Sequence, residues 1–354
     1  MSLGKRAFVV TLVAVAVIFG ALALWRLRVV IALLFFALVV SAAMRPGVDR
    51  LAEHRVPRAV GVLLHYLGLL AVVGLLLWLI VPHAVSQVQA AIGTVPTTHA
   101  EIAREARHSS GIKHELLVGL DKRLRNLPSG ASLVHPAITI GKKALEALVG
   151  IFFAFAVAAY WIFERERAMT LVLGAVKPQH RRRVRDTWIL IDQKLGAFVR
   201  GQLLMIAFVS TVLSFAFWGI GMPYWLLLGV FAGLVEMVPV VGPLVAGVLA
   251  VGVAATQSWQ QAVLAAIAVY GLRLLQDYVV NPKVLGHAVG LSPLIVLVTV
   301  SVVGILLGGA YVILSVPIAA VLATLIDVFV RDRDPAKEEV PAVIFPAKER
   351  EAAG

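Results

Sequence analysis

The 354-residue sequence contains no cysteine. This absence excludes disulfide scaffolds, thiolate zinc sites, iron–sulfur clusters and cysteine nucleophiles, although it leaves the cellular compartment undecided. Charged residues are also scarce, since they make up only 15% of the chain, against roughly 25% in ordinary soluble domains. Hydrophobic residues make up 60%, and the mean hydropathy is +0.92. The composition therefore excludes a pair of ordinary soluble domains and indicates a polytopic membrane protein.

The motifs of nucleotide-driven and hydrolytic proteins are missing as well. No Gly-x-x-x-x-Gly-Lys-Ser/Thr loop occurs, because the stretch that ends in Gly141-Lys142-Lys143 has Pro136 at the first glycine position and Lys143 at the hydroxyl position. Neither His-Glu-x-x-His nor Gly-x-Ser-x-Gly is present, so no metalloprotease or serine esterase constellation is visible. We therefore predict that the protein is not an enzyme and needs neither a cofactor nor a metal.

Acidic residues are fewer than basic ones, at 20 against 32, which gives a formal net charge of +12. In a soluble protein such an excess would suggest nucleic acid as a partner. Here the basic run from Lys177 to Arg185 follows an apolar run directly and contains no interleaved aromatic residues. We therefore predict that it contacts lipid headgroups and fixes the topology, and that nucleic acid is not a partner.

Apolar runs long enough to cross a membrane divide the chain. A hydrocarbon core of about 30 Å needs roughly 20 helical residues. Segment 1–82 holds three runs, 7–25, 29–44 and 59–82, and the first two are separated only by Arg-Leu-Arg, so we expect them to form a tight helical hairpin. Further runs follow at 144–163, 198–220, 224–255, 259–280 and 292–330. The predicted fold is all-α, a polytopic helical membrane protein with about seven or eight spans.

Polar segments separate or follow these runs. Segment 83–143 combines helix-forming stretches with several breakers, which predicts a small extracytoplasmic helical region. Segment 164–197 is basic and amphipathic and is expected to be cytoplasmic. The apolar runs within 198–330 are expected to form the transport core, and the Lys-, Glu-, Pro- and Ala-rich segment 331–354 is expected to be a disordered cytoplasmic tail.

Basic residues in short loops fix the expected orientation. Lys5 and Arg6 place the N-terminus inside, and successive crossings then place 83–143 outside and 164–197 inside. The tail ends inside only if 224–255 enters and returns as a broken hairpin, whereas a single crossing would leave the tail outside. Whether the hairpin is re-entrant or fully spanning stays open at this point. A cleaved secretory signal is disfavoured, because the first apolar run is too long and a second follows at once.

One carboxylate of this hairpin lies among helix breakers. Glu236 is followed by Pro239, Gly242 and Pro243. Proline removes a backbone donor and pushes the preceding residue out of the helical region, so a break here would expose carbonyl groups and a helix end beside Glu236. Many secondary transporters build a substrate or ion site in this way. The alternative is a plain turn between two spans, with Glu236 facing lipid headgroups.

A second polar group interrupts the run 259–280. Arg273, Asp277 and Asn281 are spaced by four and so share one helix face, with Gln276 beside them. A lone charge near the bilayer centre costs roughly 2.5–3.5 kcal/mol on insertion scales, so this face should point into protein or into a water-filled path. An Arg273–Asp277 ion pair that only joins helices is the alternative, and the two interpretations are compatible.

These segments resemble one known family. The stretch GVFAGLVEMVPVVGP from Gly229 to Pro243, the stretch QDYVVNPKVLGHAVGLSP from Gln276 to Pro293, and Gly308, Gly309 and Pro317 are together similar to the autoinducer-2 exporter family, also called the AI-2E transporter family. The resemblance covers about residues 8–330. It implies a bacterial inner-membrane permease, associated with export of the quorum-sensing signal autoinducer-2 or with sodium/proton antiport. It also implies a homo-oligomer, for which a pentamer is one expected form.

The resemblance also marks residues that should line the substrate or ion pathway. By position these are Glu236, Pro239, Gly242, Pro243, Gln276, Asp277, Asn281, Pro282, Gly286, Ser292 and Pro293, and the helix-face argument adds Arg273. Two positions depart from the family pattern, since many relatives have an amide or small residue at Glu236 and a histidine at Ser292. Glu236 adds an anion, which favours cation or proton coupling and weakens direct transfer of a neutral, sugar-like substrate.

Two hypotheses of different classes follow. The first is a secondary transporter that moves a small polar solute or a monovalent cation between the broken hairpin and the helix after it, coupled to protons or sodium, with a sodium/proton antiporter as the variant within the family. Glu236 and Asp277 would bind the proton or cation, and Arg273 would hold Asp277 ionised or bind an anionic solute. The second is a membrane scaffold that recruits partners through 164–197 and 83–143. Both place the chain among the lipids of the bacterial inner membrane, with cytoplasmic termini.

Overall fold

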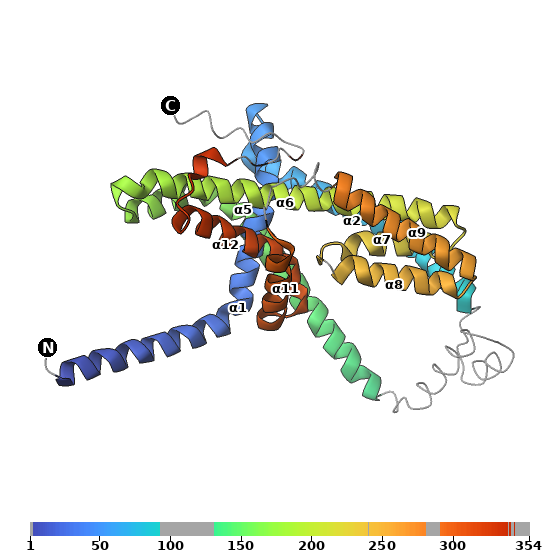
Figure 1. Cartoon of the computed structure of the whole chain (residues 1–354), viewed down its shortest axis with the longest axis horizontal. Helices are drawn as coiled ribbons and strands as arrows, with labels where there is room; N and C mark the ends of the chain where they lie inside the picture. Colours follow the sequence, from blue (N-terminus) through green and yellow to red (C-terminus); the bar gives the residue numbers. More distant parts are fainter. Residues whose placement is uncertain are drawn as a thin grey trace. The chain divides into compact units, whose positions relative to one another are not determined.

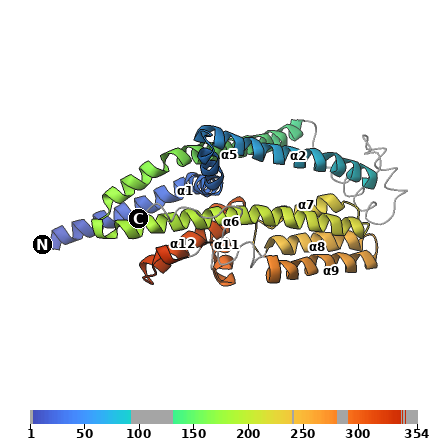
Figure 2. The ribbon, with the colours of Figure 1, turned by 90° about the horizontal axis from the view of Figure 1, so that it is seen from above.

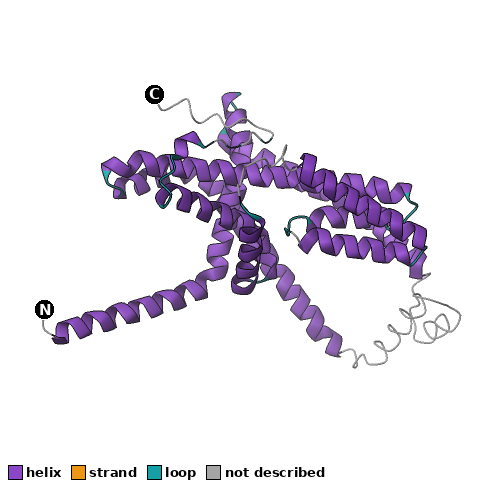
Figure 3. Cartoon of the chain, in the orientation of Figure 1, coloured by secondary structure: helices purple, strands orange, loops and turns teal. Residues whose placement is uncertain are grey.

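The computed structural model describes residues 3–92, 131–239, 241–280, 291–338, 340 and 343. Within these ranges the regular elements are all helical and no strand occurs, as Figure 3 shows. The predicted all-α class is therefore confirmed. In chain order the elements are α1 (Leu3–Glu53), α2 (Arg58–Ile92), α5 (Ala131–Ala175), α6 (Pro178–Gly219), α7 (Trp225–Val235), α8 (Val241–Ala255), α9 (Trp259–Leu275), η1 (Gln276–Val280), α11 (Pro293–Leu307), η2 (Gly309–Leu314), α12 (Ser315–Phe329) and η3 (Pro335–Lys337).

Six of the described helical segments are long and apolar enough to cross a membrane: Val10–Glu53, Arg58–Leu75, Leu148–Ala175, Pro178–Gly219, Trp259–Val280 and Gly309–Phe329. At most half of the residues in each apolar window are buried inside the structure. The remaining side chains include large apolar groups such as Phe152 and Tyr278, which are 75% and 78% exposed. Such long apolar helical surfaces suit a lipid environment, so the chain is a multi-pass membrane protein.

The expected hairpin between the runs 7–25 and 29–44 is wrong, because α1 is one continuous helix. The three intervening residues are Arg-Leu-Arg, all strong helix formers, and neither glycine nor proline is present there to end the helix. Figure 1 shows α1 bending into two arms without a loop between them. One of the arginines, Arg28, donates from Nη1 to the carbonyl oxygen of Leu306 at 2.9 Å, so the helix accommodates its charge by a hydrogen bond.

The structure describes the two expected polar segments, 83–143 and 164–197, to different extents. Most of 83–143 lies outside the described residues, so its extracytoplasmic helical character stays a prediction. Segment 164–197 forms the end of α5 and the start of α6, so it continues the flanking long helices. Helix α2 likewise continues through Pro82, where the apolar run ends. In this part of the chain the helices therefore continue beyond the ends of the apolar runs.

The chain divides into two compact units, which are described separately. Unit 1 comprises Met1–Ala43, Gly150–Gly196 and Gly290–Glu338, and unit 2 comprises Met44–Val149, Ala197–Val289 and Glu339–Gly354. In unit 1, a small cluster joins α1 to α5: its buried members are Ala37, Ala154 and Ala158, and Phe36, Val40 and Val157 pack against them. Small residues allow helix backbones to approach closely, as is usual in membrane interiors.

The start of the C-terminal tail packs in unit 1 and does not match the disorder expected for 331–354. Its first turn after α12 leads into the short helix η3. The Lys194 side chain of α6 is only 7% exposed, and its Nζ donates to Glu338 Oε1 at 2.7 Å and to Thr324 Oγ1 at 3.2 Å. A buried ammonium needs such partners, so specific charge contacts hold the tail up to Glu338 in place. Composition alone predicts none of these contacts.

Unit 2 contains the second part of α6 together with α7, α8 and α9, which lie side by side in Figures 1 and 2. The buried residues that join these helices are Val209, Leu213, Phe217, Met222, Leu228, Ala232, Ala246, Ala250, Ala254, Ala265 and Leu272. Three alanines of this core recur every four residues along α8 and so form one stripe. The stripe brings α8 close to its neighbours, and this packing positions the turn between α7 and α8.

Candidate functional site

The run 224–255 folds as two short helices, α7 and α8, and the described residues between them, 236–239, form a turn. Within the turn, Val238 N donates to the Val235 carbonyl at 2.9 Å and Gly242 N donates to the Val238 carbonyl at 2.9 Å. Pro243 is the third residue of α8, where a backbone N–H would have no partner within the helix, so this proline costs no hydrogen bond. The predicted broken hairpin is therefore confirmed.

Glycines let the hairpin pack closely. A Cβ atom at Gly242 would overlap the carbonyl oxygen of Val235, so only glycine fits where α8 begins. On the other side of α7, Cβ atoms at Gly229 and Gly233 would overlap residues of α6, Ser214 and Ser210 respectively. The Gly-x-x-x-Gly spacing thus serves helix packing, as it commonly does in membranes.

Polar contacts lie at both ends of the part of α6 that belongs to unit 2. At the turn, Gln202 Nε2 donates to the backbone carbonyl of Glu236 at 3.1 Å. At the opposite end, Gln261 Nε2 of α9 donates to the carbonyl of Ile220 at 3.2 Å, just beyond the end of α6 at Gly219. The helix between Gln202 and Gly219 is about 26 Å long at about 1.5 Å per residue. This part of α6 is a little shorter than a hydrocarbon core of about 30 Å.

The Glu236 carboxylate at this turn is largely buried, with its side chain 12% exposed. Its Oε1 accepts from Arg273 Nη1 at 3.4 Å and from Gln276 Nε2 at 3.2 Å. Both partners come from the end of α9 and the start of η1. The plain-turn alternative, in which Glu236 faces headgroups, is therefore disfavoured, because the carboxylate turns toward the protein.

Arg273 connects this carboxylate to a second one. Its Nε donates to Asp277 Oδ2 at 3.0 Å, which is the ion pair expected from the spacing of four. The Arg273 and Asp277 side chains are 39% and 42% exposed, so the group opens toward the surface of the unit on this side. We call Glu236, Arg273, Gln276 and Asp277 the Glu236 cluster. Its two carboxylates and one guanidinium leave one formal negative charge in excess when all three are ionised.

Irregular backbone borders the Glu236 cluster on two sides. One side is the turn at 236–239, and the other is η1, a π-helix of five residues that begins at Gln276 and includes Asp277. Single π-turns are rare and frequently occur at functional sites. The Arg273–Asp277 pair lies within the continuous segment of α9 and η1, and Arg273 also links this segment to Glu236 of the hairpin.

The remaining predicted pathway residues fall into three groups. The turn and the start of α8 contain Pro239, Gly242 and Pro243. Outside the described residues lie Asn281, Pro282 and Gly286. Ser292 and Pro293 belong to unit 1, where Pro293 is the first residue of α11 and Ser292 Oγ accepts from Ile295 N at 3.4 Å as the helix N-cap. The structure thus shows a capping contact for Ser292.

Sequence reasoning missed Gln202. It is an isolated amide near the start of the apolar run 198–220. A single polar residue in such a run is the sequence feature that could have indicated a specific contact. Its partner is the carbonyl of Glu236, one of the groups that α7 leaves without a partner inside the helix at its C-terminal end. Thirty-four residues separate the two in sequence, so only the packing of α6 against the hairpin reveals the contact.

Comparisons with known proteins agree with the resemblance. The sequence model of the AI-2E family transporters matches residues 12–331. Among curated proteins, YrrI of Bacillus subtilis is 24% identical over 309 residues, which cover 85% of this chain and 86% of that protein. YueF of the same organism is 25% identical over 314 residues, covering 83% and 84% of the two chains. MT0215 of Mycobacterium tuberculosis is 26% identical over 309 residues, covering 83% and 82%. All three carry names that assign them provisionally to transport.

Proposed function

Because the chain belongs to the AI-2E transporter family, we propose that it is a secondary transporter whose pathway passes the Glu236 cluster. The observation that carries this proposal is the pairing of a largely buried carboxylate, Glu236, with Arg273 and Gln276 at a helix break. Broken helices at membrane depth are tolerated where they line a cavity or are covered by protein, and transporters use them for ion and substrate sites.

The charge of the Glu236 cluster supports a cation or a proton as the coupled ion. Glu236 and Asp277 both contact the guanidinium of Arg273, and a monovalent cation or a proton that binds beside Glu236 would neutralise its carboxylate. A charge inside the membrane is costly, so this neutralisation is favourable. The transported species is a small polar solute or the cation itself. In the sodium/proton antiporter form of this proposal, sodium ions and protons bind to the same carboxylates.

The two contacts of Arg273 indicate how the site would open. Its bond to Asp277 within the helix is shorter, at 3.0 Å, than its contact with Glu236 across to the hairpin, at 3.4 Å. Arg273 can therefore stay on Asp277 while Glu236 exchanges the guanidinium for a cation or proton. Movement of the α7–α8 turn relative to α9 would then alternate access to the site.

The test is ion-coupled flux in proteoliposomes that contain the purified chain. Glu236→Gln and Asp277→Asn keep size and hydrogen bonding but remove one charge each, and we expect at least about a tenfold loss of flux, which corresponds to about 1.4 kcal/mol. Asp49→Asn is the matched control, because Asp49 forms the same kind of pair with Arg45 four residues away, at 3.3 Å, and is 39% exposed.

Wild-type flux in both cluster variants would reject the assignment of the pathway. If deletion of 83–143 then abolished function while the cluster variants kept it, the membrane scaffold hypothesis would replace the transporter. The expected setting is the bacterial inner membrane with both termini cytoplasmic, with lipid and further copies of the chain as proposed neighbours of its exposed apolar helices.

A further inference from the structure

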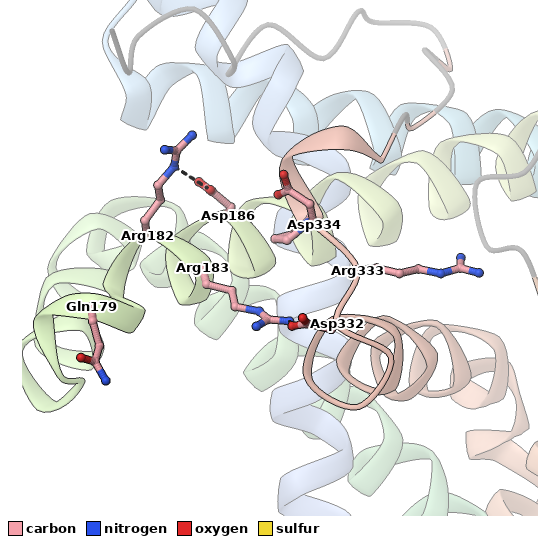
Figure 4. Close-up of a pocket in the computed structure, with 8 residues that line it drawn as sticks. Gln179, Arg182, Arg183, Asp186, Asp332, Arg333 and Asp334 are labelled. Atoms are coloured by element: carbon pink, nitrogen blue, oxygen red, sulfur yellow. Dashed lines mark ion pairs between the residues drawn. The ribbon is translucent and has the colours of Figure 1, made fainter.

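Unit 1 contains a cavity of about 400 Å³ that the transport proposal does not use. Its lining comes from the first turns of α6 and from the chain that follows α12: Gln179, Arg182, Arg183, Asp186, Asp332, Arg333, Asp334 and Pro335. Figure 4 shows side chains of α6 and of the tail on either side of this cavity. The lining thus combines three guanidinium groups with three carboxylates.

The cavity lies where a membrane span ends. The apolar segment Gly309–Phe329 is one of the candidate spans, and the first lining residue of the tail, Asp332, follows it by three positions. The residues between them include Val330, which is 76% exposed, and Phe329 itself is 52% exposed. Charged groups that directly follow an apolar span lie at the level of the lipid headgroups, so acyl chains would lie against these exposed apolar side chains.

The two arginines of α6 provide donors for a phosphate group. Arg183 is fixed in place, because its Nη2 donates to the carbonyl oxygen of Val328 and pairs with Asp332 at 2.6 Å. Its Nε is buried and has no hydrogen-bond partner among the described residues. Arg182 is 90% exposed and only loosely paired with Asp186, at 3.7 Å, so its guanidinium is available to an anion.

The carboxylates of the cavity add a second requirement. Asp186 and Asp332 balance the two arginines of α6, and Asp334 accepts a backbone hydrogen bond from Ala336 N at 3.1 Å through one oxygen only. A simple anion would meet repulsion from these carboxylates, whereas a ligand that carries both a phosphate and a primary ammonium satisfies both kinds of group. We propose that this cavity binds the headgroup of an ethanolamine phospholipid, with phosphate on Arg182 and Arg183 and ammonium toward Asp334.

The test measures lipid binding by native mass spectrometry on delipidated full-length protein. The probes are short-chain phosphatidylethanolamine, phosphatidylcholine and phosphatidylglycerol, with glycerophosphoethanolamine and inorganic phosphate as headgroup sources without acyl chains. We expect phosphatidylethanolamine to bind at least about fivefold more tightly than each of the other probes. Phosphatidylcholine lacks an N–H donor and phosphatidylglycerol lacks the ammonium, so each leaves the carboxylates unsatisfied.

Variants separate the two halves of the headgroup. Arg182→Gln should weaken binding of all phospholipids about threefold, since this exposed side chain contributes little to the fold. Arg185→Gln is the matched control, because Arg185 lies on the same helix, is exposed and does not line the cavity. Asp334→Asn keeps the backbone hydrogen bond and should reduce the affinity for phosphatidylethanolamine to that for phosphatidylcholine.

Three results would overturn the proposal. The first is equal binding of the three phospholipids, and the second is equal loss of binding in the Arg182 and Arg185 variants. The third is binding of glycerophosphoethanolamine or phosphate as tight as that of the lipid, which would make the site one for a soluble ligand. The outcome is independent of the Glu236 cluster, so loss of flux in the cluster variants neither supports nor contradicts it.

Discussion

Substitution of Gly242 by alanine tests the geometry on which the site depends. A Cβ atom at this position would overlap the carbonyl oxygen of Val235, which is backbone and cannot rotate away. That carbonyl also accepts a hydrogen bond from Val238 N at 2.9 Å, so moving it aside strains the turn itself. Relief requires α8 and the end of α7 to move apart, which shifts the turn containing Glu236 relative to its partners Arg273 and Gln276.

The expected size of the effect follows from these contacts. Inserting a methyl group into a closely packed site typically costs about 1–3 kcal/mol. Weakening the Val238 hydrogen bond adds about 1 kcal/mol. Alanine is the better helix former by about 0.5–1 kcal/mol, which offsets part of the loss. We therefore expect Gly242→Ala to reduce the free energy of unfolding by about 1–3.5 kcal/mol.

The assay is tryptophan fluorescence during thermal unfolding in detergent, with ion-coupled flux measured on the same preparations. Gly252→Ala is the matched control, since Gly252 lies on the same helix α8 and a Cβ atom there meets nothing within 4 Å. This control should be as stable as wild type or more stable, because only the gain in helix propensity applies. The reasoning is refuted if the two variants unfold at the same temperature and transport equally well.

Two further substitutions probe contacts of unit 1. Ser292→Ala removes the N-cap of α11 and should lower the free energy of unfolding by about 1 kcal/mol. Ser292→Asp should not lower it, because the aspartate can still accept a hydrogen bond from Ile295 N. Equal unfolding temperatures of the two variants would contradict the capping role. Lys194→Met removes the donor to Glu338 and should increase trypsin cleavage after Lys337 about tenfold, because a charged hydrogen bond contributes about 1.5–3 kcal/mol. Substitution of the exposed Lys177 by Met is the control, and equal cleavage in both variants would show that Lys194 does not hold the tail.

Local rules predicted the hairpin but not the first helix. Pro239, Gly242 and Pro243 each restrict the backbone within a few residues, so the break between α7 and α8 could be read directly from the sequence. In contrast, Arg26 and Arg28 suggested a loop because of their charge. Charge alone does not end a helix when the residues are good helix formers, so the backbone stays helical, and Arg28 donates a hydrogen bond to the Leu306 carbonyl.

The contacts of the candidate site likewise fall into a local group and a long-range group. The Arg273–Asp277 pair is local, and the spacing of four was sufficient to predict it. The contacts of Glu236 with Arg273 and Gln202 bridge 37 and 34 residues, so they depend on how three helices pack. The periodicity of a helix shows which of its faces is polar, but it does not show which other helix that face contacts. Only the tertiary structure supplies that second fact.

Packing and charge make separate contributions in the hairpin. Three glycines, Gly229, Gly233 and Gly242, and the alanine stripe of α8 already let the helices approach closely without any charged group. Replacing a buried ion pair by apolar residues is often neutral or stabilising, so the Arg273 and Glu236 charges are weak candidates for a purely structural role. An ionised group within an apolar span has an energetic cost, which the glycine packing does not remove. This cost supports the proposal that the Glu236 cluster binds the coupled ion or the transported solute.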